Sequence, residues 1–75
     1  MTNLELGVQI SDRRKSMGIS QKQLAVYTGL SVVTLSHIES GKANPSLETL
    51  NEIFHYLNLE FKLMLKSNNE TEGNL

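Results

Sequence analysis

Glycine and serine residues divide the first part of this chain into short segments. Their spacing constrains the fold more than any other sequence feature. Three glycines stand where helices would end, and each precedes a serine that can cap the next helix: Gly18 and Ser20, Gly29 and Ser31, Gly41 and Ser46. Helices of about eight residues are not stable alone in water. The sequence therefore predicts a compact domain of short helices that stabilise one another.

Apolar residues at helical spacing predict helices over about residues 4–17, 21–28, 32–40 and 47–57. Pro45 separates the last two because it biases the residue before it away from helical angles. The inward positions are expected to be Leu6, Ile10, Met17, Leu24, Ala25, Leu35, Ile38, Leu47, Leu50, Ile53, Phe54 and Leu57. The predicted fold class is mainly α, with a compact core of four to five helices.

After Asn58 the apolar pattern changes from helical to alternating. The alternating residues predict a β-strand over residues 59–66, and they are Leu59, Phe61, Leu63 and Leu65. A single strand has unpaired backbone groups and an uncovered apolar face. We expect the same strand of a second copy to pair with it about a two-fold axis, with Glu60 opposite Lys66 of the partner subunit. Residues 1–66 then form one domain, and the polar residues 67–75 are expected to be a disordered tail.

Composition excludes several classes of protein. The absence of cysteine excludes disulfides, a thiol nucleophile and thiolate metal ligands. No apolar run approaches the roughly 18 residues of a membrane span, and no signal peptide is expected. The two histidines, His37 and His55, match no metal-ligand or catalytic pattern. We expect a cytoplasmic protein with no enzymatic activity, metal or cofactor.

Charge is distributed unevenly along the chain. Residues 6–45 carry five basic and two acidic side chains, a net charge of +3, whereas residues 46–75 carry a net charge of −3. A basic first half favours a polyanionic partner. An ordinary solvated face explains the same charges.

The segment Ser20–Gly41 has the pattern of a helix-turn-helix, two short helices joined around Gly29. With Leu35 and Ile38 inside, the outward positions of the second helix are Val32, Val33, Ser36 and His37. Exposed valines can contact thymine methyl groups in the major groove, and a histidine can contact a base edge or a phosphate. Single exposed apolar residues are also common on protein surfaces.

The sequence resembles the phage-repressor-like (Xre-type) helix-turn-helix family over about residues 4–58. The resemblance is carried by the segments LGVQI (6–10), RRK (13–15), GISQKQLA (18–25), GLS (29–31), TLSHIESGK (34–42) and NPSLETL (44–50). It implies a DNA-binding domain, usually dimeric, whose recognition helix follows Ser31. It also implies a phosphate contact at Gln21 and an internal salt bridge between Arg14 and Glu39. The family's recognition positions commonly carry Gln, Arg or Ser, and Val32 and Val33 depart from that pattern.

Together the residues and the resemblance predict a DNA interface that comprises Gln21, Lys22, Ser31, Val32, Val33, Ser36, His37, Lys42 and Asn44. The expected ligand is double-stranded DNA with a palindromic operator.

The segment LNLEFKL (57–63) after the last helix is similar to HipB-type antitoxins, in which a C-terminal strand pairs across the dimer. That narrower resemblance implies a HipA-like kinase toxin as partner and repression of the protein's own operon. Two alternatives stay open: a stand-alone repressor, and a protein-interaction module that has lost DNA binding.

Overall fold

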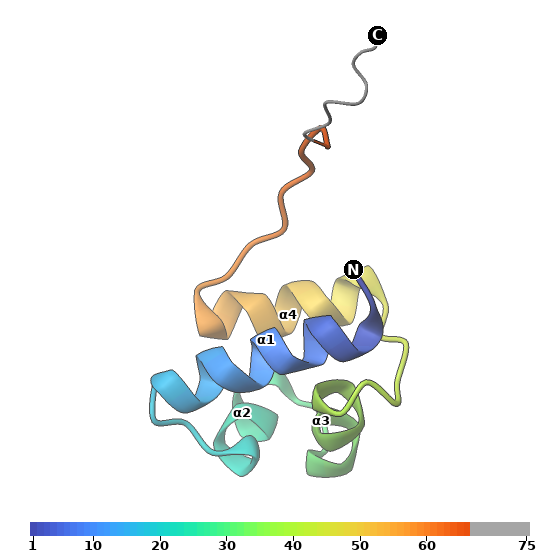
Figure 1. Ribbon diagram of the computed structural model, residues 1–75. Helices are drawn as coiled ribbons and strands as arrows, with labels where there is room; N and C mark the ends of the chain where they lie inside the picture. Colours follow the sequence, from blue (N-terminus) through green and yellow to red (C-terminus); the bar gives the residue numbers. More distant parts are fainter. Residues whose placement is uncertain (67–75) are drawn as a thin grey trace, which may run out of the picture.

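The computed structural model describes residues 1–66 and contains four helices in that range: α1 (Asn3–Ser16), α2 (Gln21–Thr28), α3 (Val32–Glu39) and α4 (Leu47–Leu57). Helices α1 and α4 lie side by side, and α2 and α3 lie beneath them (Figure 1). The mainly helical fold class is confirmed.

Each helix begins at a residue whose side-chain oxygen accepts a hydrogen bond from the backbone N–H three positions on. The predicted serine caps are present at Ser20, Ser31 and Ser46. The first helix has a cap that we did not predict, Thr2, which forms a reciprocal capping box with Glu5. The Thr-x-x-Glu pattern was visible in the sequence and explains why this helix begins at Asn3 rather than Leu4.

The core contains one or more fully buried side chains from every helix, namely Ile10, Leu24, Leu35, Ile53 and Leu57. Two predicted core residues are exposed instead. Leu47 is 64% exposed because it lies in the first turn of α4, beyond the end of the apolar stripe. Met17 is 40% exposed because it is the C-cap of α1 and follows the last helical turn.

The predicted β-strand over residues 59–66 is absent from the described chain, which contains no strand. These residues form an extended arm that leaves the end of α4 and runs away from the helices (Figure 1). A strand is defined by hydrogen bonds to a neighbour, and within residues 1–66 this segment has no such neighbour. The expected tail, residues 67–75, lies outside the described residues.

The start of the arm is held in place by α1 and α4. Asn58 adopts the left-handed conformation (φ 57°), and the next backbone N–H, that of Leu59, donates to the Phe54 carbonyl at 2.9 Å. The Arg13 side chain donates from Nε to the Leu57 carbonyl at 2.8 Å. The direction of the arm is therefore set by contacts with the helices.

Candidate nucleic-acid interface

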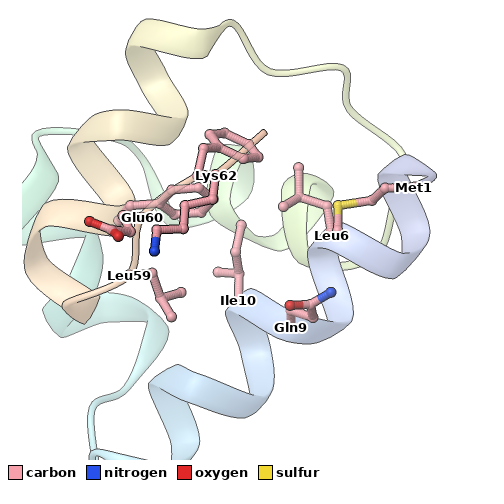
Figure 2. A pocket seen from close by; sticks show the side chains of 9 residues that line it. Met1, Leu6, Gln9, Ile10, Leu59, Glu60 and Lys62 are labelled. Carbon is pink, nitrogen blue, oxygen red and sulfur yellow. The ribbon is translucent and has the colours of Figure 1, made fainter. Parts of the chain in front are cut away.

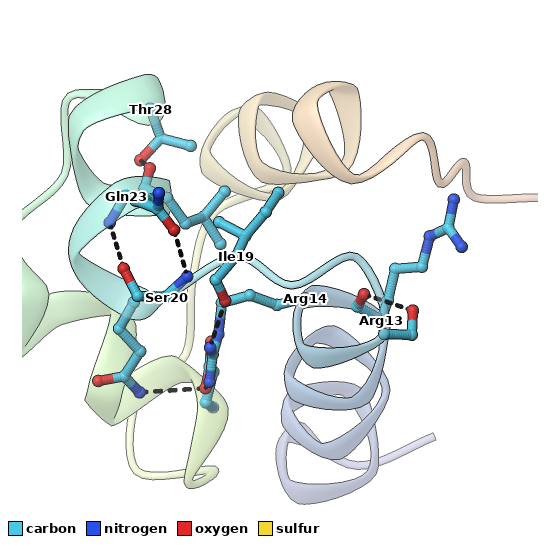
Figure 3. Close-up of polar contacts among 10 residues, drawn as sticks. Arg13, Arg14, Ile19, Ser20, Gln23 and Thr28 are labelled. Carbon is cyan, nitrogen blue, oxygen red and sulfur yellow. Dashed lines mark hydrogen bonds and ion pairs between the residues drawn. The ribbon is translucent and has the colours of Figure 1, made fainter.

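The turn between α2 and α3 presents α3 at the surface. Ser20 and Gln23 exchange hydrogen bonds at the start of α2, with Ser20 Oγ accepting from the Gln23 N–H at 3.0 Å and Gln23 Oε1 accepting from the Ser20 N–H at 2.8 Å (Figure 3). Gly29 ends α2 in the left-handed conformation (φ 76°), which a side chain would strain. Ser31 then begins α3, with its Oγ accepting from the Thr34 N–H at 3.0 Å. These local bonds make the two helices short and join them by a sharp turn.

One side of α3 is buried and the other faces solvent. Leu35 and Ile38 pack in the core. We call the opposite side the outer face of α3, and its residues are Val32, Val33, Ser36 and His37, all of which are exposed. Val33 is the more open of the two valines, at 64% exposure against 41% for Val32. The helix thus offers methyl groups, a hydroxyl and an imidazole on one surface.

A buried ion pair supports α3 from beneath. Arg14 and Glu39 form two parallel hydrogen bonds, from Nε to Oε2 at 2.7 Å and from Nη2 to Oε1 at 2.9 Å. The two side chains are 9% and 6% exposed. Arg14 also donates from Nη1 to the Ile19 carbonyl at 2.7 Å (Figure 3), which ties the loop before α2 to the same group.

Gln21 contributes to this buried cluster. It is half-buried, and its side-chain amide donates to Glu39 Oε1 at 3.0 Å. This contact gives the Gln21 side chain an inward role that the sequence did not predict. The Gln21 side chain is thus already engaged within the domain, and the phosphate contact expected at this position stays a prediction.

The cluster keeps Glu39 ionised. Burial by itself raises the pKa of this carboxyl group, but the hydrogen bonds from Arg14 and Gln21, together with the Arg14 charge, outweigh burial. The net result is a pKa for Glu39 below its ordinary value of 4.5. A charged carboxylate therefore links α1, α2 and α3 at neutral pH.

Three further polar residues of the predicted interface are exposed, and one of them, Asn44, accepts at Oδ1 from the Asn3 side-chain amide at 3.5 Å. Lys22 is exposed in the first turn of α2, and Lys42 and Asn44 are exposed in the loop after α3. That loop is anchored to the end of α3, because the Lys42 N–H donates to the His37 carbonyl at 2.8 Å. Ser31 is exposed, but its hydroxyl serves the α3 cap.

Gly7 positions α3, a role that the sequence pattern did not predict. A Cβ atom at Gly7 would lie 2.5 Å from the Glu39 carbonyl oxygen and closer still to that of Ile38. Helix α1 therefore crosses the end of α3 at a distance that only glycine permits. The only available signal was a glycine inside a helical pattern, where it is unfavourable by itself.

The part of the chain that the structure describes, residues 1–66, contains no cluster of potential metal ligands. In the same range no helix has the length and apolar character needed to cross a membrane.

Comparisons with known proteins agree with this geometry. A family model described as helix-turn-helix matches residues 10–63. The chain is 37% identical over 60 residues to the ImmF control region 10 kDa protein of Bacillus phage phi105, covering 80% of this chain and 67% of that protein. It is 49% identical over 37 residues to an uncharacterized HTH-type transcriptional regulator of Haemophilus influenzae, which covers 49% of this chain but only 38% of that protein.

Solved structures with similar folds are also regulators. The restriction-modification controller protein C.AhdI from Aeromonas hydrophila superposes with a TM-score of 0.74 and 28% identity, over 77% of this chain and 88% of that one. The clp gene regulator ClgR from Corynebacterium glutamicum superposes with a TM-score of 0.76 and 27% identity, over 79% of this chain and 76% of that one. The chain belongs to the phage-repressor-like (Xre-type) helix-turn-helix family of DNA-binding transcriptional regulators.

Proposed function

We propose that this protein is a homodimeric repressor that reads a palindromic operator with the outer face of α3. The observation that carries the proposal is the construction of that face. Val32, Val33, Ser36 and His37 are exposed on a helix whose other side is held by a buried core and a buried ion pair. Rigid support of exposed side chains is what base recognition requires, since the contacts depend on position.

The chemistry of the outer face suits a mixed readout of the major groove. Valine methyl groups can pack on thymine methyl groups, and Ser36 and His37 can exchange hydrogen bonds with base edges. Lys22, Lys42 and Asn44 are exposed and can contact phosphates, which would fix the orientation of the domain but add no sequence preference.

The proposal predicts that substitutions at base contacts and at phosphate contacts have different effects on operator binding and on binding to random DNA. Val33→Ala and His37→Ala should each weaken operator binding by about 1–3 kcal/mol and change binding to random DNA little. Lys42→Ala should weaken both by similar factors and flatten the salt dependence of binding. Gel shifts on the protein's own promoter and on a scrambled duplex, at several salt concentrations, measure these effects. If Val33→Ala and His37→Ala weakened binding to both duplexes equally, Val33 and His37 would not be base-reading residues.

The dimer is proposed from the arm. The side chains of Leu63 and Leu65 are fully exposed to solvent. They continue the alternating pattern of Leu59 and Phe61. Pairing of two arms would satisfy the backbone groups on the two edges that meet and would bring these leucines together. A two-fold axis through the paired arms would present two α3 helices to successive major grooves, about 34 Å apart.

Removing the arm should therefore separate dimerisation from folding. A chain ending at Asn58 should keep its helical circular dichroism, sediment as a monomer and bind the operator at least about a hundredfold more weakly, because linked half-sites gain about 10²–10⁴ from avidity. A chain ending at Lys66 is the matched control and should remain a dimer. If the shorter chain still formed dimers at the same concentration, the dimer interface would lie on the helices and not on the arm.

The antitoxin role stays a prediction from the resemblance of residues 57–63 to HipB-type proteins. It requires a HipA-like kinase toxin, and a kinase gene beside this one whose product co-purifies with the full chain would support it. A stand-alone repressor would have no such neighbour. An interaction module without DNA binding would shift neither the promoter fragment nor the scrambled duplex.

A further inference from the structure

A cavity of about 220 Å³ lies where the arm leaves the helices. Its walls come from both ends of the described chain, with Leu6, Gln9 and Ile10 of α1 on one side and Leu59, Glu60 and Lys62 of the arm on the other (Figure 2). Phe54 of α4, Phe61 and Met1 complete the lining. The interior is thus mostly apolar, and polar side chains stand among the lining residues.

The arm is attached at this cavity and free beyond it. The Phe61 ring lies 4.7 Å from the Phe54 ring, centroid to centroid, at an interplanar angle of 59°. The following apolar residues, Leu63 and Leu65, contact solvent with almost their whole surface. Because the arm runs away from the helices (Figure 1), Leu65 lies about 13 Å beyond Phe61, if each extended residue adds about 3.3 Å. A chain's own Leu65 is therefore directed away from its own cavity.

We propose that this cavity receives the side chain of Leu65 of the partner subunit. The inference rests on the proposed dimer and adds a specific contact to it. Antiparallel arms centred on Leu63 place each residue opposite the one equally far on the other side of the centre. Phe61, which lines the cavity, then stands opposite Leu65 of the partner subunit, and directly opposed side chains have Cβ atoms about 5 Å apart.

Charge supports this register. The same pairing places Glu60, which lines the cavity, opposite Lys66 of the partner subunit. Opposite charges in directly opposed positions stabilise antiparallel pairs, whereas like charges destabilise them. The same register thus pairs opposite charges beside the cavity and places an exposed leucine opposite Phe61 in its lining.

The size of the cavity fits one aliphatic side chain. A buried apolar cavity of about 150 Å³ holds a benzene molecule, so about 220 Å³ accommodates the four side-chain carbons of a leucine. Because the dimer is two-fold symmetric, the same contact occurs twice, with one leucine in each of the two cavities. Each chain is then incomplete without the other.

Cross-linking tests the contact, because the chain has no cysteine of its own. A protein carrying only Gln9→Cys is mixed with one carrying only Leu65→Cys, the subunits are exchanged and the mixture is oxidised. A covalent dimer that requires both proteins is expected on a non-reducing gel, because Gln9 lines the cavity. The matched control replaces Gln9→Cys with Lys15→Cys, an exposed position of α1 outside the cavity lining, and should give little product.

A third variant separates this inference from the proposed dimer. Leu63→Cys alone should cross-link to itself, because it lies at the two-fold axis in this register. Cross-linking of Leu63→Cys without a product from Gln9→Cys with Leu65→Cys would keep the arm dimer and overturn the cavity contact. Failure of both would overturn the arm dimer too, while the gel shift on the promoter still decides DNA binding independently.

Two alanine variants test how much the Leu65 contact contributes to the stability of the dimer. Leu65→Ala should raise the dimer dissociation constant about a hundredfold, since both cavities lose a buried side chain, whereas Met64→Ala should change it less than about threefold. Sedimentation equilibrium measures both constants. Equal effects of the two variants would show that Leu65 enters no cavity.

Discussion

Replacing Glu39 with alanine should lower the free energy of unfolding by about 3–5 kcal/mol. Removal of the carboxylate leaves the Arg14 guanidinium buried with its charge uncompensated, and it also removes the acceptor of the Gln21 amide. Exposed Glu52 provides the control, and Glu52→Ala should cost less than about 0.5 kcal/mol. Urea unfolding of the variants at one protein concentration measures the difference, and similar midpoints would mean that the pair contributes no more than a surface ion pair.

The same carboxylate should make the protein acid-sensitive. The pKa of Glu39 is lowered in the folded state, so protonation favours the unfolded chain. Its contribution is complete above the ordinary, unfolded-state pKa of 4.5 and is lost as pH falls through the lower folded-state value. The unfolding midpoint of Glu39→Gln should accordingly depend less on pH below 4.5 than that of the unmodified protein.

Replacing Gly7 with alanine should destabilise the domain by about 3 kcal/mol, although helix propensity alone predicts stabilisation of about 1 kcal/mol. The added methyl group would overlap the carbonyl oxygens of Ile38 and Glu39, which are backbone atoms and can move only if α1 separates from α3. Since α3 carries the outer face, operator binding should weaken as well.

Gly18→Ala is the matched control for this glycine. Gly18 has a positive φ of 71° but open space around it, so alanine there should cost only about 1–2 kcal/mol of backbone strain. Thermal unfolding of both variants decides the ranking. A Gly7→Ala protein as stable as the parent would mean that α1 and α3 can separate at little cost.

Local features of the sequence predicted the helices well. The serine caps and positive-φ glycines act within a few residues, so the ends of α2 and α3 follow from the nearby sequence with an error of about one residue. The outward positions of α3 followed equally directly, because Leu35 and Ile38 at helical spacing leave Val33 and His37 on the other side. The outer face could thus be proposed from the sequence, and the family resemblance already implied the Arg14–Glu39 pair beneath it.

The β-strand predicted over residues 59–66 was wrong for the described chain because an alternating pattern alone does not form a strand. Alternation of Leu59, Phe61, Leu63 and Leu65 describes which side of an extended segment is apolar. It does not supply a hydrogen-bonding neighbour, and the described part of the chain has none for this segment. Two of the four residues, Leu59 and Phe61, pack against the chain's own helices, whereas Leu63 and Leu65 do not.

The sequence by itself determined where the helices begin and end and which side of α3 faces outward, because caps, turns and apolar spacing act between neighbours in the chain. Only the tertiary structure decided how α3 is supported. The close approach at Gly7, the inward turn of Gln21 toward Glu39 and the cavity beneath the arm join residues far apart in sequence. Such contacts depend on the distances between packed helices, and those distances are set by all the core side chains together.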